Sequence, residues 1–238
     1  MSAVAAPSVY SGGASVIAVG VLLAEFGMFR QALLRDQVRL YAAQSGLISA
    51  LAVLVAAARQ LPELYVLAAL SAGLKVVIVP IVLRRLLRGL GHGGDGAQQD
   101  QAAHGWTEIA GSGSLSLAST ILLAIAVAAF GFFSVGALRI ASPVLPPTAL
   151  AISVSVALVA FVLMIMRRDV ASQAIGFLSL ENGISLAALV VAAGMPLILE
   201  VAFLFDLLVA VVVFELLIRL HHGRAESLST ADLTSLRG

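Results

Sequence analysis

Seven stretches of about 20 mostly apolar residues divide this chain, and each is long enough to cross the roughly 30 Å hydrocarbon core of a bilayer as a helix. They cover residues 11–29, 40–58, 64–83, 114–138, 148–166, 170–193 and 197–218. Each stretch is far longer than the roughly ten residues of a transmembrane barrel strand, which favours helices. Of the 238 residues, 61% are hydrophobic and 11% are charged, against about 45–50% and about 25% in soluble domains. The sequence therefore predicts an all-α integral membrane protein with about seven transmembrane helices.

The longest connection between these stretches divides the chain into parts. Residues 1–90 form an N-terminal three-helix transmembrane part, and residues 114–222 form a four-helix transmembrane part. The segment 91–113 between them is rich in glycine, glutamine and aspartate and reads as a flexible cytoplasmic linker, with a metal- or phosphate-binding loop as the alternative. Residues 223–238 form a cytoplasmic tail.

Basic residues predict the orientation, because cytoplasmic loops of membrane proteins are enriched in lysine and arginine. One set of loops holds Arg30, Arg35, Arg39, Arg84, Arg85, Arg88, Arg167, Arg168, Arg219, Arg224 and Arg237. The opposite set holds only Arg59 and Arg139. This asymmetry predicts an external N-terminus and a cytoplasmic C-terminus, which agrees with an odd number of helices.

The composition also restricts the chemistry that the chain performs by itself. It contains no cysteine, and its four histidines fall in predicted loops or in the tail. No set of residues has the spacing of metal or haem ligands, so we expect no cofactor and no metal in this chain. The formal net charge of +1 favours no nucleic-acid partner, and the lipid bilayer is the partner that the composition predicts.

Ionisable residues inside the predicted helices are the candidates for function. A charged group at membrane depth costs about 2.5–3.5 kcal/mol on insertion scales and usually faces a protein interior or water. Glu181 lies near the middle of the sixth helix, with Asn182 and Ser185 beside it as supporting hydrogen-bonding groups. Asp206 lies near the middle of the seventh helix and Glu200 lies closer to its outer end. Each acid is interpreted either as a proton-relay carboxyl or as a structural acid bonded to a neighbouring helix.

Lys75, the only lysine, lies at mid-depth in the third helix. A buried lysine either pairs with an acid or loses its proton, so it is predicted as the cation of a relay or as a structural partner of an acid such as Asp206. Glu25 lies close to the cytoplasmic end of the first helix, where pairing with an arginine is the expected arrangement. Glu215 lies one turn from the cytoplasmic boundary and is expected to be solvated or salt-bridged.

The last three predicted helices resemble the K-type subunit of the membrane arm of respiratory complex I. The resemblance begins at residue 148 and rests on paired arginines at 167–168, an acid within the apolar sixth helix, and an acid-bearing last helix with a basic end. Over its whole length the chain is similar to the component E membrane subunit of hydrogenase-4 and formate hydrogenlyase-type complexes. The supporting segments are 63–70, 74–75, 180–187, 194–196 and 204–208.

This resemblance implies a non-redox subunit of a bacterial cytoplasmic (inner) membrane complex. Its partners would be antiporter-like membrane subunits and a hydrogenase- or quinone-type module. Glu181 would be the first relay glutamate, and Asp206 or Glu200 the second, in proton or cation translocation coupled to electron transfer. The alternatives are a stand-alone secondary transporter, which needs a substrate cavity with discontinuous helices, and a structural scaffold subunit packed through small residues such as Gly131.

Overall fold

The computed structural model describes residues 8–31, 33–90, 117–137, 145–167 and 170–192, together with Phe205, Leu208, Val209, Val212 and Val213. These residues are almost entirely helical and include no β-strand. The elements are α1 (Ser8–Arg30), α2 (Leu34–Arg59), α3 (Pro62–Ala72), the π-helical segment η1 (Gly73–Ile78), α4 (Val79–Leu90), α6 (Leu117–Ala137), α7 (Pro147–Met166) and α8 (Val170–Ala192). Within the described residues, six helical spans are long and apolar enough to cross a membrane. The predicted all-helical architecture is therefore confirmed for the described residues, and its six long apolar helices suit a multi-pass membrane protein.

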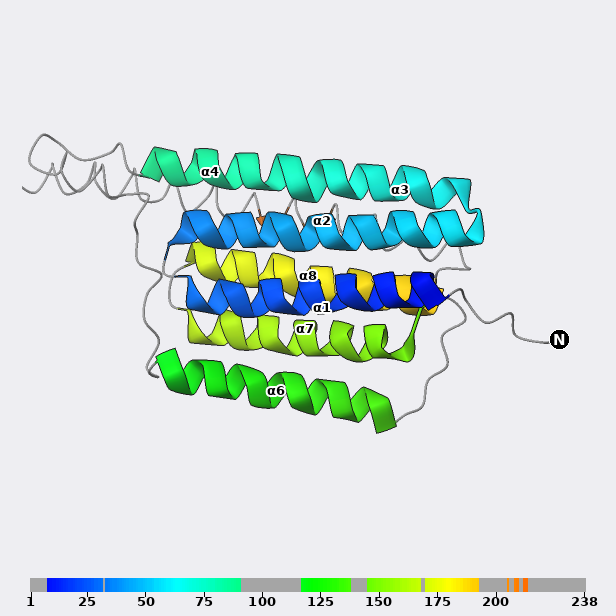
Figure 1. The fold of residues 1–238 in the computed structure, drawn as a ribbon. Helices are drawn as coiled ribbons and strands as arrows, with labels where there is room; N and C mark the ends of the chain where they lie inside the picture. Colours follow the sequence, from blue (N-terminus) through cyan, green and yellow to red (C-terminus); the bar gives the residue numbers. More distant parts are fainter. Residues whose placement is uncertain are drawn as a thin grey trace, which may run out of the picture.

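The helices lie side by side with roughly aligned axes (Figure 1). α7 packs between α6 and α8, and α1 packs against both α2 and α7. α2 also contacts α8 and the continuous rod formed by α3, η1 and α4. As Figure 1 shows, this rod and α6 lie at opposite edges, and α1, α2, α7 and α8 form the centre. The central helices are therefore the ones able to enclose polar groups away from lipid.

The second helix begins earlier than the charge pattern predicts. Its predicted start was Leu40, with Arg35, Asp36 and Arg39 in a loop, but α2 begins at Leu34. The charged side chains occupy the outer face of the first turns, where Arg39 Nη1 lies 2.9 Å from Asp36 Oδ1. The opposite face of the same turns is buried. The prediction was wrong because an amphipathic helix start carries charges without ending the helix.

The third membrane span contains a π-helical turn that no sequence pattern indicated. The N–H of Val79 donates to the carbonyl of Leu74, five residues earlier, within the turn that contains Lys75. Pro80 follows directly; it has no N–H to donate, and its ring clashes with the carbonyl four residues before it. A widened turn relieves this conflict, and such π turns occur frequently at functional sites.

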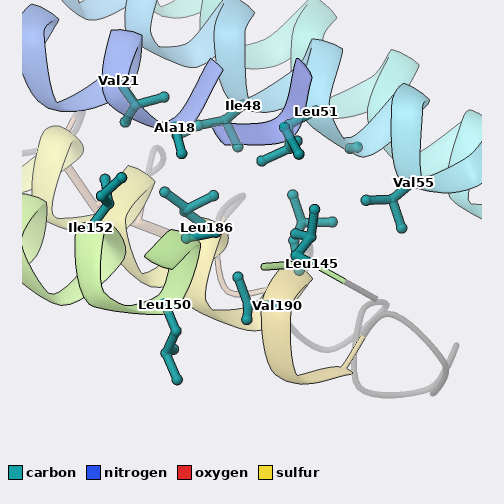
Figure 2. Close-up of a cluster of buried hydrophobic side chains, with 14 of the residues drawn as sticks. Ala18, Val21, Ile48, Leu51, Val55, Leu145, Leu150, Ile152, Leu186 and Val190 are labelled. Atoms are coloured by element: carbon teal, nitrogen blue, oxygen red, sulfur yellow. The ribbon is translucent and has the colours of Figure 1, made fainter. Parts of the chain in front are cut away.

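The buried apolar residues form two clusters at different depths of the bundle. One cluster is shown in Figure 2, where side chains of α1, α2, α7 and α8 converge: Ala18, Val21, Ile48, Leu51, Val55, Leu150, Ile152, Leu186 and Val190. The other cluster lies towards the α1–α2 and α7–α8 connections and includes Met28, Val38, Leu163, Ile175 and Leu178. Along α1, α2 and α8 there is a break between the two clusters, and polar residues occupy it.

Two glycines let the central helices approach closely. A Cβ added to Gly183 on α8 would lie 2.9 Å from the backbone nitrogen of Ala157 on α7. A Cβ on Gly131 of α6 would lie 3.1 Å from the Cα of Ser155, also on α7. Small residues at such contacts suit helix packing in a membrane, where van der Waals contact replaces much of the hydrophobic effect.

Several predicted features lie outside the described residues: the linker 91–113, the tail 223–238, Glu200, Asp206 and Glu215. Of the predicted seventh helix, the five described residues are all helical, and Val209 and Val213 are buried in the second apolar cluster. The seventh span and the orientation in the membrane stay predictions.

Gly183→Ala tests the contact between α7 and α8. The added methyl group overlaps backbone that cannot move without separating the helices, so we expect a loss of about 1–3 kcal/mol in stability. The matched control is Gly136→Ala on α6, because a Cβ there meets no atom within 4 Å. Thermal loss of monodispersity of the detergent-solubilised chain measures both. Equal melting temperatures for the two variants would contradict the close contact.

Candidate functional site

A layer of buried polar side chains separates the two apolar clusters. It includes Glu25 on α1, Gln44 and Ser45 on α2, and Lys75 on η1. α8 contributes Ser179, Glu181, Asn182 and the partly buried Ser185. Each helix therefore changes from apolar to polar and back to apolar within a few residues. This is the arrangement expected of ionisable groups held inside a bundle rather than towards lipid.

Lys75 and Glu181 form a buried ion pair at the centre of this layer. The Lys75 Nζ atom lies 2.6 Å from Glu181 Oε1, and each side chain is 4% exposed. Lys75 also donates to Asn182 Oδ1 at 3.3 Å and to Ser185 Oγ at 3.2 Å. The Ser185 hydroxyl donates in turn to Glu181 Oε1 at 2.9 Å. These three acceptors of the Lys75 ammonium group all belong to α8.

The π turn positions the lysine for this pairing. α8 packs against α2, and the rod containing η1 packs against α2 as well. Lys75 is the buried residue of the π turn, and its long side chain spans the space between the rod and α8. A π turn rotates side chains relative to an uninterrupted α-helix. The turn therefore determines which face of the rod presents the ammonium group to the interior.

Two amide side chains extend the layer from Lys75 towards α1. Asn182 Nδ2 donates to Gln44 Oε1 and to Ser45 Oγ, both at 2.9 Å. Gln44 Nε2 then donates to Glu25 Oε2 at 2.8 Å. The Ser179 hydroxyl hydrogen-bonds both Gln44 Oε1 and Glu25 Oε2. The polar groups of α1, α2, η1 and α8 consequently belong to one connected network.

A second, smaller polar contact lies one heptad away on the same two helices. Ser172 Oγ donates to Gln37 Oε1 at 3.0 Å, and seven residues later Ser179 contacts Gln44. Because the residue numbers rise together on both helices, α2 and α8 run parallel. Near this end Arg167 donates to the carbonyls of Phe29 and Gln31, which ties the α7–α8 connection to the α1–α2 connection.

The structure unites four of the predicted site residues. Lys75 hydrogen-bonds Glu181, Asn182 and Ser185, and Ser185 also hydrogen-bonds Glu181. The acid beside Lys75 is Glu181, where the sequence suggested a partner such as Asp206. Asp206 and Glu200 lie outside the described residues.

Glu25 is the residue that sequence reasoning placed wrongly. It is fully buried and bonded to Gln44 and Ser179 rather than to an arginine. Because Glu25 is close to Arg30 in the sequence, it was expected at the cytoplasmic end of the helix. In the structure its side chain faces α2 and α8 instead. A usable signal was present on the second helix, where Gln37, Gln44 and Ser45 recur on one face of an otherwise apolar stretch.

The network has the chemistry of proton exchange. It contains two carboxyl groups and one amine within an otherwise apolar bundle, joined by hydroxyl and amide groups that both donate and accept hydrogen bonds. A carboxyl beside an ammonium group in a low-dielectric surrounding changes its charge with each proton that it gains or loses. The arrangement therefore suits moving a proton, or a monovalent cation, through the bundle.

A double-mutant cycle tests the energetic coupling of the ion pair. Lys75→Met and Glu181→Leu each remove one partner of the buried pair, and each is expected to cost about 3–5 kcal/mol of stability. The double variant removes both charges and should lose clearly less than the sum of the two single losses. Asp36→Asn, which breaks the exposed Arg39–Asp36 pair, should change stability by less than about 1 kcal/mol. Additive losses in thermal unfolding would show that the pair is uncoupled.

Comparison with known proteins adds one short similarity. No protein-family model matches the chain, and no solved structure matches it. The chain is 42% identical over 84 residues to a protein of Mycobacterium tuberculosis named Uncharacterized protein Rv0085. This match covers 35% of the chain and 36% of the relative, so the chain spans about a third of that relative's length.

Proposed function

We propose that this chain is a non-redox membrane subunit of a complex I-like or group 4 [NiFe]-hydrogenase-type complex. In this proposal it contributes buried carboxyl groups to proton or cation translocation that is coupled to electron transfer in other subunits. The observation that supports it best is the Lys75–Glu181 pair, held at 2.6 Å within the polar layer of a membrane bundle. The resemblance of the last three predicted helices to the K-type subunit supports the same assignment.

The polar layer favours a relay over a purely structural role. A buried ion pair is weak as a stabilising device, because desolvating both groups offsets much of their attraction. Here the pair is also connected through two amides, Asn182 and Gln44, to a second acid, Glu25. Tight packing of α6, α7 and α8 is already provided by Gly131 and Gly183, which need no charge.

The proposed arrangement in the cell follows from the basic residues. The chain would have seven spans, an external N-terminus and a cytoplasmic C-terminus, in the cytoplasmic membrane of a bacterium. Antiporter-like subunits and a hydrogenase- or quinone-type module would be its partners, and Asp206 or Glu200 would supply a further relay acid from the seventh span.

One observation favours a stand-alone secondary transporter as a second candidate. Transporters place coupling sites at interrupted helices, and the π turn at Gly73–Ile78 interrupts the third span at Lys75. Cation uptake by liposomes that contain only the purified chain would support this alternative.

Copurification is the first test of the complex. A tagged chain extracted in mild detergent should bring down antiporter-like subunits and a hydrogenase- or quinone-reactive module, identified by mass spectrometry. Recovery of the chain alone, as a stable monomer or homodimer, would contradict the proposal.

Glu181→Gln tests the coupling role within the isolated complex. We expect electron transfer to continue while proton uptake into inside-out vesicles falls on the order of tenfold or more, because the amide has no proton to exchange. Glu63→Gln is the matched control, since Glu63 is exposed at the start of α3. Unchanged proton uptake in Glu181→Gln would leave this residue a structural one.

Fusions to the C-terminus test the predicted orientation. Green fluorescent protein joined there should fluoresce, and alkaline phosphatase joined there should be inactive, because both report a cytoplasmic position. The opposite pair of results would reverse the proposed topology.

A further inference from the structure

The hydrogen bonds between Lys75 and Glu25 all point the same way. Lys75 donates to Asn182, Asn182 donates to Gln44, and Gln44 donates to Oε2 of Glu25. Each amide therefore presents its oxygen towards the ammonium group and its N–H towards the Glu25 carboxyl. Two aligned amide dipoles stabilise a positive charge at one end and a negative charge at the other. Lys75 is consequently linked to two acids: directly to Glu181, and through two amides to Glu25.

The charges of the described groups indicate that this cluster holds a proton. The described part of the layer contains two carboxyls and one amine, all buried. With every group ionised the cluster would have a net negative charge within an apolar bundle, which is strongly unfavourable. One additional proton on a carboxyl makes the cluster neutral, so the two acids compete for a single proton.

The hydrogen-bond partners of the two acids favour one of them as the holder of that proton. Glu181 Oε1 accepts from the ammonium group of Lys75 as well as from Ser185, whereas Glu25 Oε2 accepts from two uncharged groups, Gln44 and Ser179. Glu25 is fully buried, and its Oε1 has no hydrogen-bond partner among the described residues. Burying an ionised carboxylate with one oxygen that accepts no hydrogen bond costs more free energy than burying the neutral acid in the same place. The geometry therefore suits an ionised Glu181 and a protonated Glu25.

We propose that Glu25 is a second proton-carrying carboxyl of this site, and that Glu25 and Glu181 share one proton around Lys75. This inference rests on the proposed translocation function and assigns to it a residue on α1. In the transfer step a proton leaves Glu25 and protonates Glu181, and the negative charge passes from Glu181 to Glu25. Lys75 stays an ammonium ion throughout, held first by Glu181 and then through Asn182 and Gln44.

Infrared spectroscopy of the purified full chain tests this sharing. A protonated carboxyl has a carbonyl stretch separate from the carboxylate and amide bands, and the band shifts in heavy water. At neutral pH the difference spectrum of Glu25→Gln against the wild type should show the loss of one buried carboxyl band. Glu181→Gln should lose the same band, because Glu25 then ionises opposite Lys75. Lys75→Met should increase this carboxyl signal about twofold, since neither acid then has a cation beside it.

Two further variants guard against misfolding and misassignment. Glu25→Asp keeps a carboxyl at position 25, so the band should persist at a shifted frequency. Asp36→Asn removes a partly exposed carboxyl that pairs with Arg39 and should leave the band unchanged. A band that survives Glu25→Gln unchanged would overturn the proposal. A band that is lost in Glu25→Gln but unchanged in Glu181→Gln and Lys75→Met would also overturn the proposal, because Glu25 would then be an isolated structural acid.

These spectra need no partner protein. A failure to recover a complex in copurification therefore refutes the proposed function without affecting the shared proton. Conversely, recovery of an intact proton-pumping complex, together with a Glu25 carboxyl band that is unchanged in Glu181→Gln, would refute only the shared proton.

Discussion

One buried cation determines the interior of this bundle. Lys75 lies among apolar helices, where an unpaired ammonium group would be strongly unfavourable, so its surroundings have to supply acceptors. α8 supplies three of them within one turn and a half: Glu181, Asn182 and Ser185. α2 packs against α8 and against the rod formed by α3, η1 and α4, and the Lys75 side chain reaches from this rod to α8. Asn182 then donates a hydrogen bond to Gln44, and Gln44 donates one to Glu25. The polar groups of the layer therefore find their hydrogen-bond partners in one another.

Different helices provide the mechanical and the polar parts of the structure. α6, α7 and α8 meet through Gly131 and Gly183, and the hydroxyl of Ser155 on α7 bonds to a backbone carbonyl of α6. The ionisable groups belong to α1, η1 and α8, with α2 as the bridge. α8 takes part in both, because Gly183 faces α7 while its neighbours Glu181 and Asn182 face the polar layer. A substitution on this helix therefore affects packing and chemistry together unless it preserves side-chain volume.

Six of the predicted helical spans, and the location of Glu181 and Lys75 inside them, could be predicted because both follow from single-residue properties. A long apolar stretch requires a helix in lipid, and a charge inside it requires a partner. The partnership itself joins residues 106 positions apart and depends on how helices pack, which one sequence does not specify. The π turn depends on how the helix accommodates the missing N–H and the ring of Pro80, which the sequence pattern does not specify. The burial of Glu25 depends on which face of α1 packs against α2. The start of α2 was misplaced because charge alone was used to end helices, although its buried face continues through Val38 to Leu34.

The two apolar clusters have an electrical consequence. They confine Glu25, Lys75 and Glu181 to one depth, with apolar residues towards each side of the membrane. Moving a unit charge across a membrane involves about 2.3 kcal/mol per 100 mV, in proportion to the depth that it crosses. In the proposed transfer, charge that passes between Glu25 on α1 and Glu181 on α8 would move parallel to the membrane plane and do almost no work against the voltage. Only the proposed steps that bring a proton into the layer, or release it, would cross an apolar cluster and respond to the membrane potential.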